Sequence, residues 1–227
     1  MINLNSYGEI CESYNALFHS DTVQTIGHYD LDLSKTKIDF ITCSAHKFHG
    51  PKGVGFIYVK NGTNLIPFIE GGGQERGMRG GTESIHNIAG LKKAFELSYE
   101  SLQRDSKDVL KIKKHFINSI KKSIPEVKIN GNFSEDNSSY AILNLCLPIS
   151  VDKKTLLNFK LDLAGIACSA GSACQSGSSK PSHVLSELLS KNEMEKISLR
   201  FSFSKYNSVE EVDYVIEFLN KFIKDNN

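Results

Sequence analysis

The sequence predicts an α/β protein, in which part of a large domain with a mostly parallel sheet is followed by a small α+β domain. Short apolar runs at residues 16–20 and 40–43 each end in polar residues, as buried strands do at the edge of a sheet. The polar residues Asp21 and Lys47, which follow these runs, lie 26 residues apart. This spacing leaves room for the crossover connection that neighbouring parallel strands require.

The amino-terminal segments continue this pattern. Residues 7–15 predict a short amphipathic helix, with Ile10, Cys11 and Tyr14 on its buried side. A second apolar run, residues 54–59, follows the Gly50–Gly53 turn and predicts another strand. Lys47 therefore lies on a stiff strand-turn-strand frame.

The remaining segments predict the small domain. Apolar residues recur every three or four positions in 84–102 and from about 109 to 124, giving one long helix or two, with Pro125 as the stop. We place a domain boundary near residue 104, so that the large-domain part spans 1–104 and the small domain spans 105–227. Further predicted elements are strands at 140–147 and 197–203, a helix at 155–163 and a final helix opened by the capping box of Ser208 and Glu211. One apolar stripe of this final helix contains Val212, Val215, Ile216, Leu219, Phe222 and Ile223.

Bulk properties exclude several classes of protein. The 40% hydrophobic content suits a folded core, and a net charge of +1 offers no electrostatic footprint for nucleic acid. Neither a membrane-spanning run nor a signal peptide is visible, so we expect a cytoplasmic protein that contacts no membrane. The five cysteines form no Cys-x-x-Cys pair and their number is odd, which argues against a disulfide framework or a zinc finger.

Asp21 and Lys47 have side chains that could act together on one ligand. Ligands gather at the carboxyl ends of parallel strands, so the two side chains can face one cleft. A carboxylate opposite an imine-forming lysine is the protein's contribution to pyridoxal phosphate chemistry, because the acid keeps the ring nitrogen protonated. Taken by itself, Lys47 is also compatible with an ordinary surface lysine.

The segments around these residues resemble the cofactor motifs of cysteine desulfurases, pyridoxal 5′-phosphate enzymes of the class V aminotransferase family. The matching residues are His19-Ser20-Asp21-Thr22-Val23-Gln24 and Ser44-Ala45-His46-Lys47 with Gly50-Pro51-Lys52-Gly53. The resemblance implies that Asp21, Gln24, Ser44, Ala45, His46 and Lys47 bind the cofactor. It also implies that Gln24 bonds the ring hydroxyl and that Ser44 and His46 help to hold the phosphate.

Residues 70–82 form a glycine-rich loop with two arginines and end at Thr82, a plausible helix cap. Exposed backbone amides, a cationic fork and a helix terminus suit an anion such as phosphate. In the family this loop crosses a dimer interface, and the matching threonine binds the cofactor phosphate of the partner subunit. Thr82 therefore implies a homodimer.

Two residues of the small domain carry further expectations. Arg200 lies on the face of its strand opposite to the apolar side chains, and the resemblance implies that it binds the substrate carboxylate. Cys174 lies in a run of small and polar residues, whereas Cys43, Cys146 and Cys168 lie in or beside apolar runs and are expected to be inert. The Ser-Ala-Gly-Ser-Ala-Cys setting of Cys174 resembles the persulfide-forming loop of the nitrogen-fixation and iron–sulfur-assembly desulfurases.

These expectations combine into one function. Lys47 and Cys174 are the catalytic residues, L-cysteine is the substrate, alanine is the product, and the sulfur passes from a Cys174 persulfide to an acceptor or scaffold protein that serves iron–sulfur clusters or tRNA thiolation. Cys174 is also a candidate for a transient iron–sulfur ligand. No direct contact with nucleic acid is expected.

Other functions remain open. The resemblance begins at about Tyr7 but covers only the carboxyl-terminal part of the family's length, so we expect a truncated or split chain that binds the cofactor poorly and turns over little alone. A selenocysteine lyase or a class V aminotransferase would share Asp21 and Lys47. A non-catalytic dimerising or scaffold fragment is the alternative from another class.

Overall fold

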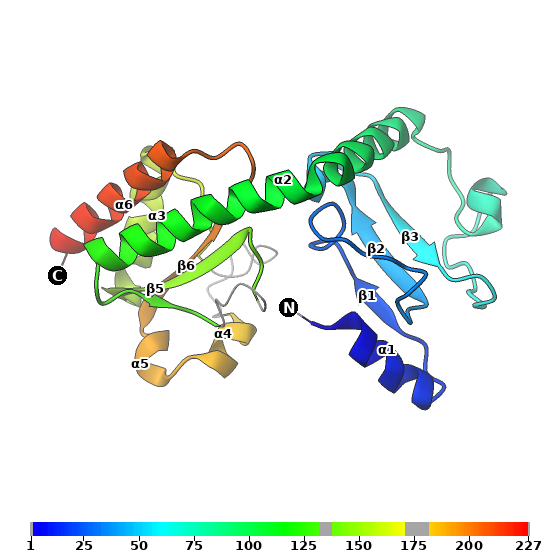
Figure 1. Ribbon diagram of the computed structural model, residues 1–227, viewed down its shortest axis with the longest axis horizontal. Coiled ribbons are helices and arrows are strands. Elements are labelled where there is room, and N and C mark those ends of the chain that lie inside the picture. The colour runs from blue at the N-terminus through cyan, green and yellow to red at the C-terminus, as the bar shows by residue number, and fades with distance from the viewer. Residues whose placement is uncertain (1, 132–137, 171–181, 227) are drawn as a thin grey trace. The chain divides into compact units, whose positions relative to one another are not determined.

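Two three-stranded sheets organise the part of the chain that the structure describes. The structure is a computed structural model, and it describes residues 2–131, 138–170 and 182–226. Residues 2–103 and residues 104–227 form separate compact units, here called the N-terminal unit and the C-terminal unit. Each sheet belongs to one unit (Figure 1).

The N-terminal unit is built on the strands β1 (His19–Asp21), β2 (Phe40–Ser44) and β3 (Gly55–Val59), in that order across the sheet. β1 is parallel to β2, and β3 is antiparallel to β2, so the described sheet is mixed. The short turn between β2 and β3 allows only the antiparallel arrangement. The predicted strands at 40–43 and 54–59 are confirmed. The hydrophobic core of this unit contains the buried residues Ile26, Ile38, Ile41, Cys43, Ala45 and Phe48.

The first helix, α1 (Leu4–Ser13), contacts the unit through Gly8. A Cβ at Gly8 would lie 2.2 Å from the carbonyl oxygen of Lys37, so only glycine allows this approach. Positions two and six residues from Gly8 lie on the opposite side of a helix with 3.6 residues per turn. The prediction that Ile10 and Tyr14 are buried is therefore wrong, because they are 55% and 81% exposed.

Helix α2 (Ile85–Ser123) is one continuous helix, which decides between the one or two helices left open by the sequence. Its first half contributes Phe95, whose ring makes edge-to-face contacts with Phe48 and Phe56 of the N-terminal unit. Its second half contributes Phe116 and Ile120 to the core of the C-terminal unit. The helix ends just before Pro125, which cannot continue it.

The C-terminal unit contains an antiparallel sheet formed by β4 (Lys128–Ile129), β5 (Ile142–Ser150) and β6 (Lys196–Ser202), in that order. The helices of this unit are α3 (Lys154–Leu163), α4 (His183–Leu188), α5 (Lys191–Met194) and α6 (Val209–Lys224). Short 3-10 turns η1 (Ala45–Phe48), η2 (Gln74–Gly77) and η3 (Val151–Lys153) complete the described elements. The predicted strands and helices of this region are confirmed, with ends shifted by a few residues.

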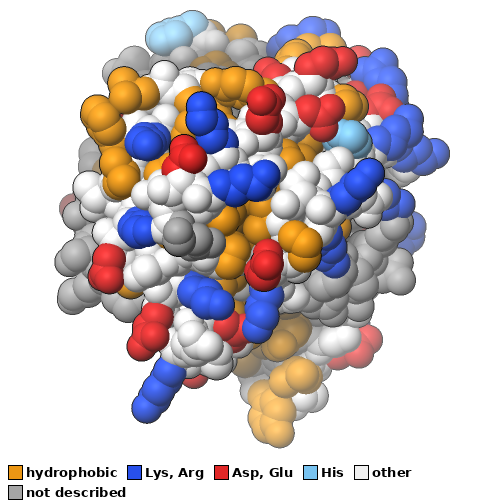
Figure 2. Space-filling view, turned by 90° about the vertical axis from the view of Figure 1, so that its left-hand side faces the viewer, with side chains coloured by type: hydrophobic (Ala, Val, Ile, Leu, Met, Phe, Trp, Pro, Cys, Tyr) orange, Lys and Arg blue, Asp and Glu red, His pale blue; other side chains and the backbone are white. Residues whose placement is uncertain are grey.

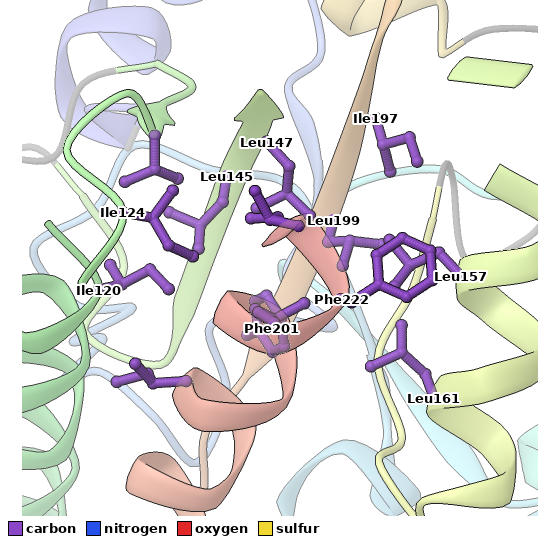
Figure 3. Close-up of a cluster of buried hydrophobic side chains, with 14 of the residues drawn as sticks. Ile120, Ile124, Leu145, Leu147, Leu157, Leu161, Ile197, Leu199, Phe201 and Phe222 are labelled. Atoms are coloured by element: carbon purple, nitrogen blue, oxygen red, sulfur yellow. The ribbon is translucent and has the colours of Figure 1, made fainter. Parts of the chain in front are cut away.

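Alternating side chains of β5 and β6 pack against α3 and α6 (Figure 3). Leu145, Leu157 and Leu199 are fully buried there. The predicted capping box of α6 is present, because Ser208 Oγ accepts a hydrogen bond from the Glu211 amide and the Glu211 carboxylate accepts one from the Ser208 amide. Five of the six predicted stripe residues of α6 are buried, namely Val212, Ile216, Leu219, Phe222 and Ile223.

The face drawn in Figure 2 is mixed in charge. Acidic, basic and hydrophobic side chains are intermixed on it. No helix within the described ranges has the length and apolar character needed to cross a bilayer.

Candidate active site

The candidate site in the N-terminal unit lies where the parallel strands β1 and β2 end. The register pairs Asp21 with Thr42, so Asp21 ends β1 two residues before β2 ends at Ser44. The turn η1, which contains Lys47, begins directly after Ser44. Parallel strands end at the same edge of a sheet, so Asp21 and the Lys47 turn belong to one edge.

Asp21 is an exposed carboxylate with a local hydrogen bond. Its Oδ1 accepts a hydrogen bond from the Val23 amide at 2.9 Å. The negative charge of Asp21 also influences the buried Cys43 thiol, whose pKa is raised to about 11 mainly by burial and further by Asp21. Among the described residues no cation pairs with Asp21, so its charge is available to a ligand.

Lys47 is half-buried in η1, and its backbone is anchored. Its carbonyl oxygen lies 2.8 Å from Nε2 of His28, in the segment that connects β1 to β2. Within the described part of the chain, no group pairs with the Lys47 ammonium. A fixed backbone and an unpaired amine are what a lysine needs to bond covalently to an aldehyde.

The residues beside Lys47 differ in exposure. Ser44 precedes η1, but its side chain does not cap the turn, so its hydroxyl can bind another group. His46 and Gln24 are exposed. Ala45 is fully buried in the core, where its side chain supports the turn and is not open to solvent.

The glycine-rich loop contains η2 and ends before α2. Glu75 and Arg76 have positive φ values of 48° and 56°, which are uncommon for residues other than glycine. The prediction that Thr82 caps the following helix is wrong, because α2 begins at Ile85 and Ser84 directly precedes it. Thr82 is exposed, so its hydroxyl still faces solvent.

Arg200 belongs to the C-terminal unit. Its strand places Ile197, Leu199 and Phe201 in the core and Arg200 on the other face, as predicted. Nη2 of Arg200 donates to the Ser169 hydroxyl at 3.4 Å, and the two residues also exchange backbone hydrogen bonds. The Nε atom is buried and has no hydrogen-bond partner among the described residues.

The three cysteines that lie in or beside apolar runs have the environments expected of unreactive thiols. Cys43 and Cys146 are buried, and Cys168 is half-buried. Burial raises the pKa of Cys168 to about 11 and raises the pKa of Cys146 as well. Cys174, the predicted nucleophile and possible metal ligand, lies outside the described residues. No group of three or more potential metal-binding side chains occurs within the ranges that the structure describes.

Two contacts of these sites were not predicted. The spacing of the sequence does not indicate that His28 reaches Lys47, because the contact depends on the path of an irregular connection. The bridge between Ser169 and Arg200 joins residues 31 positions apart and has no local sequence signal.

The chain belongs to the aminotransferase class-V family, whose model matches residues 1–215. Enzymes of this family depend on pyridoxal phosphate. The chain is 43% identical to the cysteine desulfurase IscS of Clostridium botulinum, with 97% of this chain and 55% of that protein covered. It therefore spans about half the length of the curated relatives it matches.

Solved structures of NifS-like proteins have a similar fold. A NifS-like protein matches with a TM-score of 0.83 and 32% identity, over 97% of this chain and 56% of that one. A NifS-like protein from Rickettsia africae matches with a TM-score of 0.83 and 28% identity, over 97% of this chain and 57% of that one. The described residues thus adopt part of the fold of these enzymes.

The residues present at the ends of β1 and β2 fit pyridoxal phosphate. The cofactor has an aldehyde, a basic ring nitrogen and an anionic phosphate. The Lys47 amine suits the aldehyde, and the Asp21 carboxylate suits the protonated ring nitrogen. The Ser44 hydroxyl, which does not cap η1, and the exposed imidazole of His46 can donate hydrogen bonds to a phosphate.

Proposed function

We propose that this chain is part of a pyridoxal-phosphate-dependent cysteine desulfurase that converts L-cysteine to L-alanine and retains the sulfur on Cys174. One observation carries the proposal. Asp21 and the turn of Lys47 follow neighbouring parallel strands, and the Lys47 ammonium has no partner among the described residues. The 43% identity to a cysteine desulfurase supports the choice of reaction.

Each group of the N-terminal unit has a role in this proposal. Pyridoxal phosphate, when bound, supplies an electron sink for negative charge at the substrate Cα. Asp21 holds the proton on the ring nitrogen through its negative charge, and Lys47 removes the proton from Cα. Gln24 bonds the ring hydroxyl, while Ser44 and His46 donate to the phosphate. Ala45 supports this set of residues from the core, where it is buried.

Arg200 binds the carboxylate of L-cysteine in this proposal. A buried guanidinium nitrogen without an acceptor is unfavourable, and a carboxylate would supply the missing acceptor. The planar guanidinium can also donate two parallel hydrogen bonds to a carboxylate. The buried Nε atom of Arg200 supports this role.

Cys174 performs the sulfur transfer in this proposal. Its thiolate attacks the substrate sulfur, so that a sulfur–sulfur bond forms and the carbon–sulfur bond of the substrate breaks. The electron pair of the broken bond stays with the carbon, which gains a proton and leaves as alanine. The persulfide then passes its outer sulfur to an acceptor protein, and the assembly is a homodimer in which Thr82 binds the phosphate of the partner's cofactor.

The test measures alanine release from L-cysteine in the presence of pyridoxal phosphate. Because we expect slow turnover by the chain alone, a second measurement does not depend on turnover. Reduction with cyanoborohydride links the cofactor to a lysine, and the modified lysine is then identified. We expect linkage at Lys47, no alanine from Lys47→Ala, and greatly reduced alanine release from Cys174→Ser. Cys11→Ser, which changes a half-exposed thiol elsewhere, is the matched control and should retain the rate.

The other outcomes identify the alternatives. Normal alanine release by Cys174→Ser would contradict the role of that thiol. Turnover restricted to selenocysteine, or amino-group transfer to a keto acid, would indicate a selenocysteine lyase or an aminotransferase. Absence of linkage at Lys47 would favour a non-catalytic scaffold.

A further inference from the structure

The carbonyl of Lys47 has no donor available from the backbone that follows it. In a tight turn this carbonyl would accept from an amide three or four residues later, which means from Gly50 or residue 51. The Gly50 amide donates instead to the Ala45 carbonyl at 2.9 Å. Residue 51 is Pro51, which has no amide hydrogen. The backbone end of η1 therefore depends on a donor from elsewhere.

His28 supplies that donor. Its Nε2 lies 2.8 Å from the Lys47 carbonyl oxygen, which is an ordinary hydrogen-bond distance. A carbonyl can only accept, so Nε2 must carry the hydrogen. The contact joins the connection between β1 and β2 to the residue that we assign to the cofactor aldehyde.

His28 is held in place by its neighbours. The turn after β1 starts at buried Thr22, whose amide and hydroxyl both donate to the Thr42 carbonyl, at 3.1 and 2.7 Å. Next to His28, Gly27 has φ of +78°, and a Cβ there would lie 2.5 Å from Cβ of Phe48. Because Gly27 packs on Phe48, the adjacent His28 lies against the adjacent Lys47.

We propose that His28 is a positioning residue for Lys47, which holds the lysine turn through a hydrogen bond from Nε2 to the Lys47 carbonyl. The inference rests on the proposed role of Lys47. The same segment begins directly after Asp21, so it joins the two residues assigned to opposite parts of the cofactor. The hydrogen bond of His28 reaches the backbone of Lys47.

The test compares three substitutions of His28 in the whole chain. Leucine removes the donor, asparagine keeps an amide too short to reach the carbonyl, and glutamine places its amide nitrogen near the position of Nε2. The measured quantity is the rate at which pyridoxal phosphate and cyanoborohydride modify Lys47, determined by peptide mass spectrometry. Exposed Lys52 is the internal control, and His183→Leu, on exposed α4, is the control substitution.

We expect His28→Leu and His28→Asn to slow modification of Lys47 by about three- to tenfold, the range given by loss of one hydrogen bond. Modification of Lys52 should not change, and His28→Gln should restore the rate at Lys47. A wild-type rate in both deficient variants, or failure of glutamine to restore it, overturns the inference. If leucine prevents folding, the comparison of asparagine with glutamine still decides the question.

Amide hydrogen exchange separates this inference from the proposed function. If Lys47 of the unchanged chain reacts no faster than Lys52, the assignment of Lys47 to the cofactor fails. The effect of His28 on the turn is then measured by exchange at the Gly50 amide, which donates to the Ala45 carbonyl of η1. The exchange rate should increase in the leucine and asparagine variants and should equal that of the unchanged chain in the glutamine variant. An unchanged exchange rate in the leucine and asparagine variants overturns the inference.

Discussion

At the scale of single residues, burial separates the thiols of this chain. Cys43 and Cys168 both have a pKa of about 11 because burial disfavours the thiolate, whereas an ordinary thiol ionises near 9.0. Only the thiolate is a strong nucleophile. Low reactivity is therefore expected from the core around them, and this expectation agrees with the apolar runs in or beside which they lie.

We therefore predict slow alkylation of Cys43 and Cys168 by iodoacetamide at neutral pH, with half-exposed Cys11 reacting faster. The thiolate fraction of a group with its pKa two units higher is about a hundredfold smaller. The rates at Cys43 and Cys168 should rise as the pH increases toward about 11. Peptide mass spectrometry on the Cys174→Ser variant measures them, and equal rates at Cys11 and Cys168 near neutral pH would contradict the prediction.

The same pKa values give the sign of a stability change. Between about 9 and 11 the unfolded chain has already lost these thiol protons, while the folded chain retains them. The unfolded state then binds fewer protons, so the free energy of unfolding falls as the pH rises through this interval.

At the scale of elements, α2 contacts the turn that follows Lys47. Gly90 of α2 lies against Pro51, and a Cβ at Gly90 would be 2.6 Å from Cγ of that proline. Alanine is normally the better helix residue, by about 1 kcal/mol. Here the missing side chain is what allows the helix to approach the turn.

We predict that Gly90→Ala destabilises the protein by about 1–3 kcal/mol, the usual range for overpacking, in spite of the higher helix propensity of alanine. Asn118→Ala, at an exposed position of the same helix, is the matched control and should be neutral or slightly stabilising. Urea unfolding followed by circular dichroism measures both variants. A gain in stability for Gly90→Ala would show that the contact with Pro51 is easily relieved.

At the scale of the whole molecule, the described residues form two hydrophobic cores, one in each unit. The N-terminal core contains Ile41 and Phe48, and the C-terminal core contains Leu145 and Leu199. The long helix α2 contributes side chains to both. Each unit buries its own apolar residues, so each has its own source of stability.

We predict that Leu145→Ala destabilises the C-terminal unit by about 2–5 kcal/mol, because it leaves a cavity at a fully buried position. Hydrogen exchange should accelerate in β5 and β6 and change little in β2. Ile41→Ala should have the reverse pattern, and Phe159→Ala, at a side chain that is 60% exposed, is the control. Equal acceleration in both units after Leu145→Ala would show that they unfold together.

The periodicity of the sequence predicted much of the local structure. Apolar runs located β2 and β3, and the strands β5 and β6 were also predicted. The stripe and capping box of α6 were correct because short-range geometry determines them. Local pattern was insufficient for Ile10 and Tyr14, since the packed side of α1 depends on how closely Gly8 approaches Lys37. Thr82 was misassigned for a related reason, because several polar residues before Ile85 suit a cap.

By itself, the sequence indicated which residues are chemically suited to the proposed reaction, because residue type and spacing allow Asp21 and Lys47 to face one cleft and place Arg200 off the apolar face of its strand. Only the tertiary structure decided which atoms lack partners and which segments meet. The Nε of Arg200, which has no partner within the described ranges, and the hydrogen bond from His28 to Lys47 depend on contacts between segments distant in sequence. Such contacts result from the packing of whole units, and residue order alone does not encode them in any local pattern.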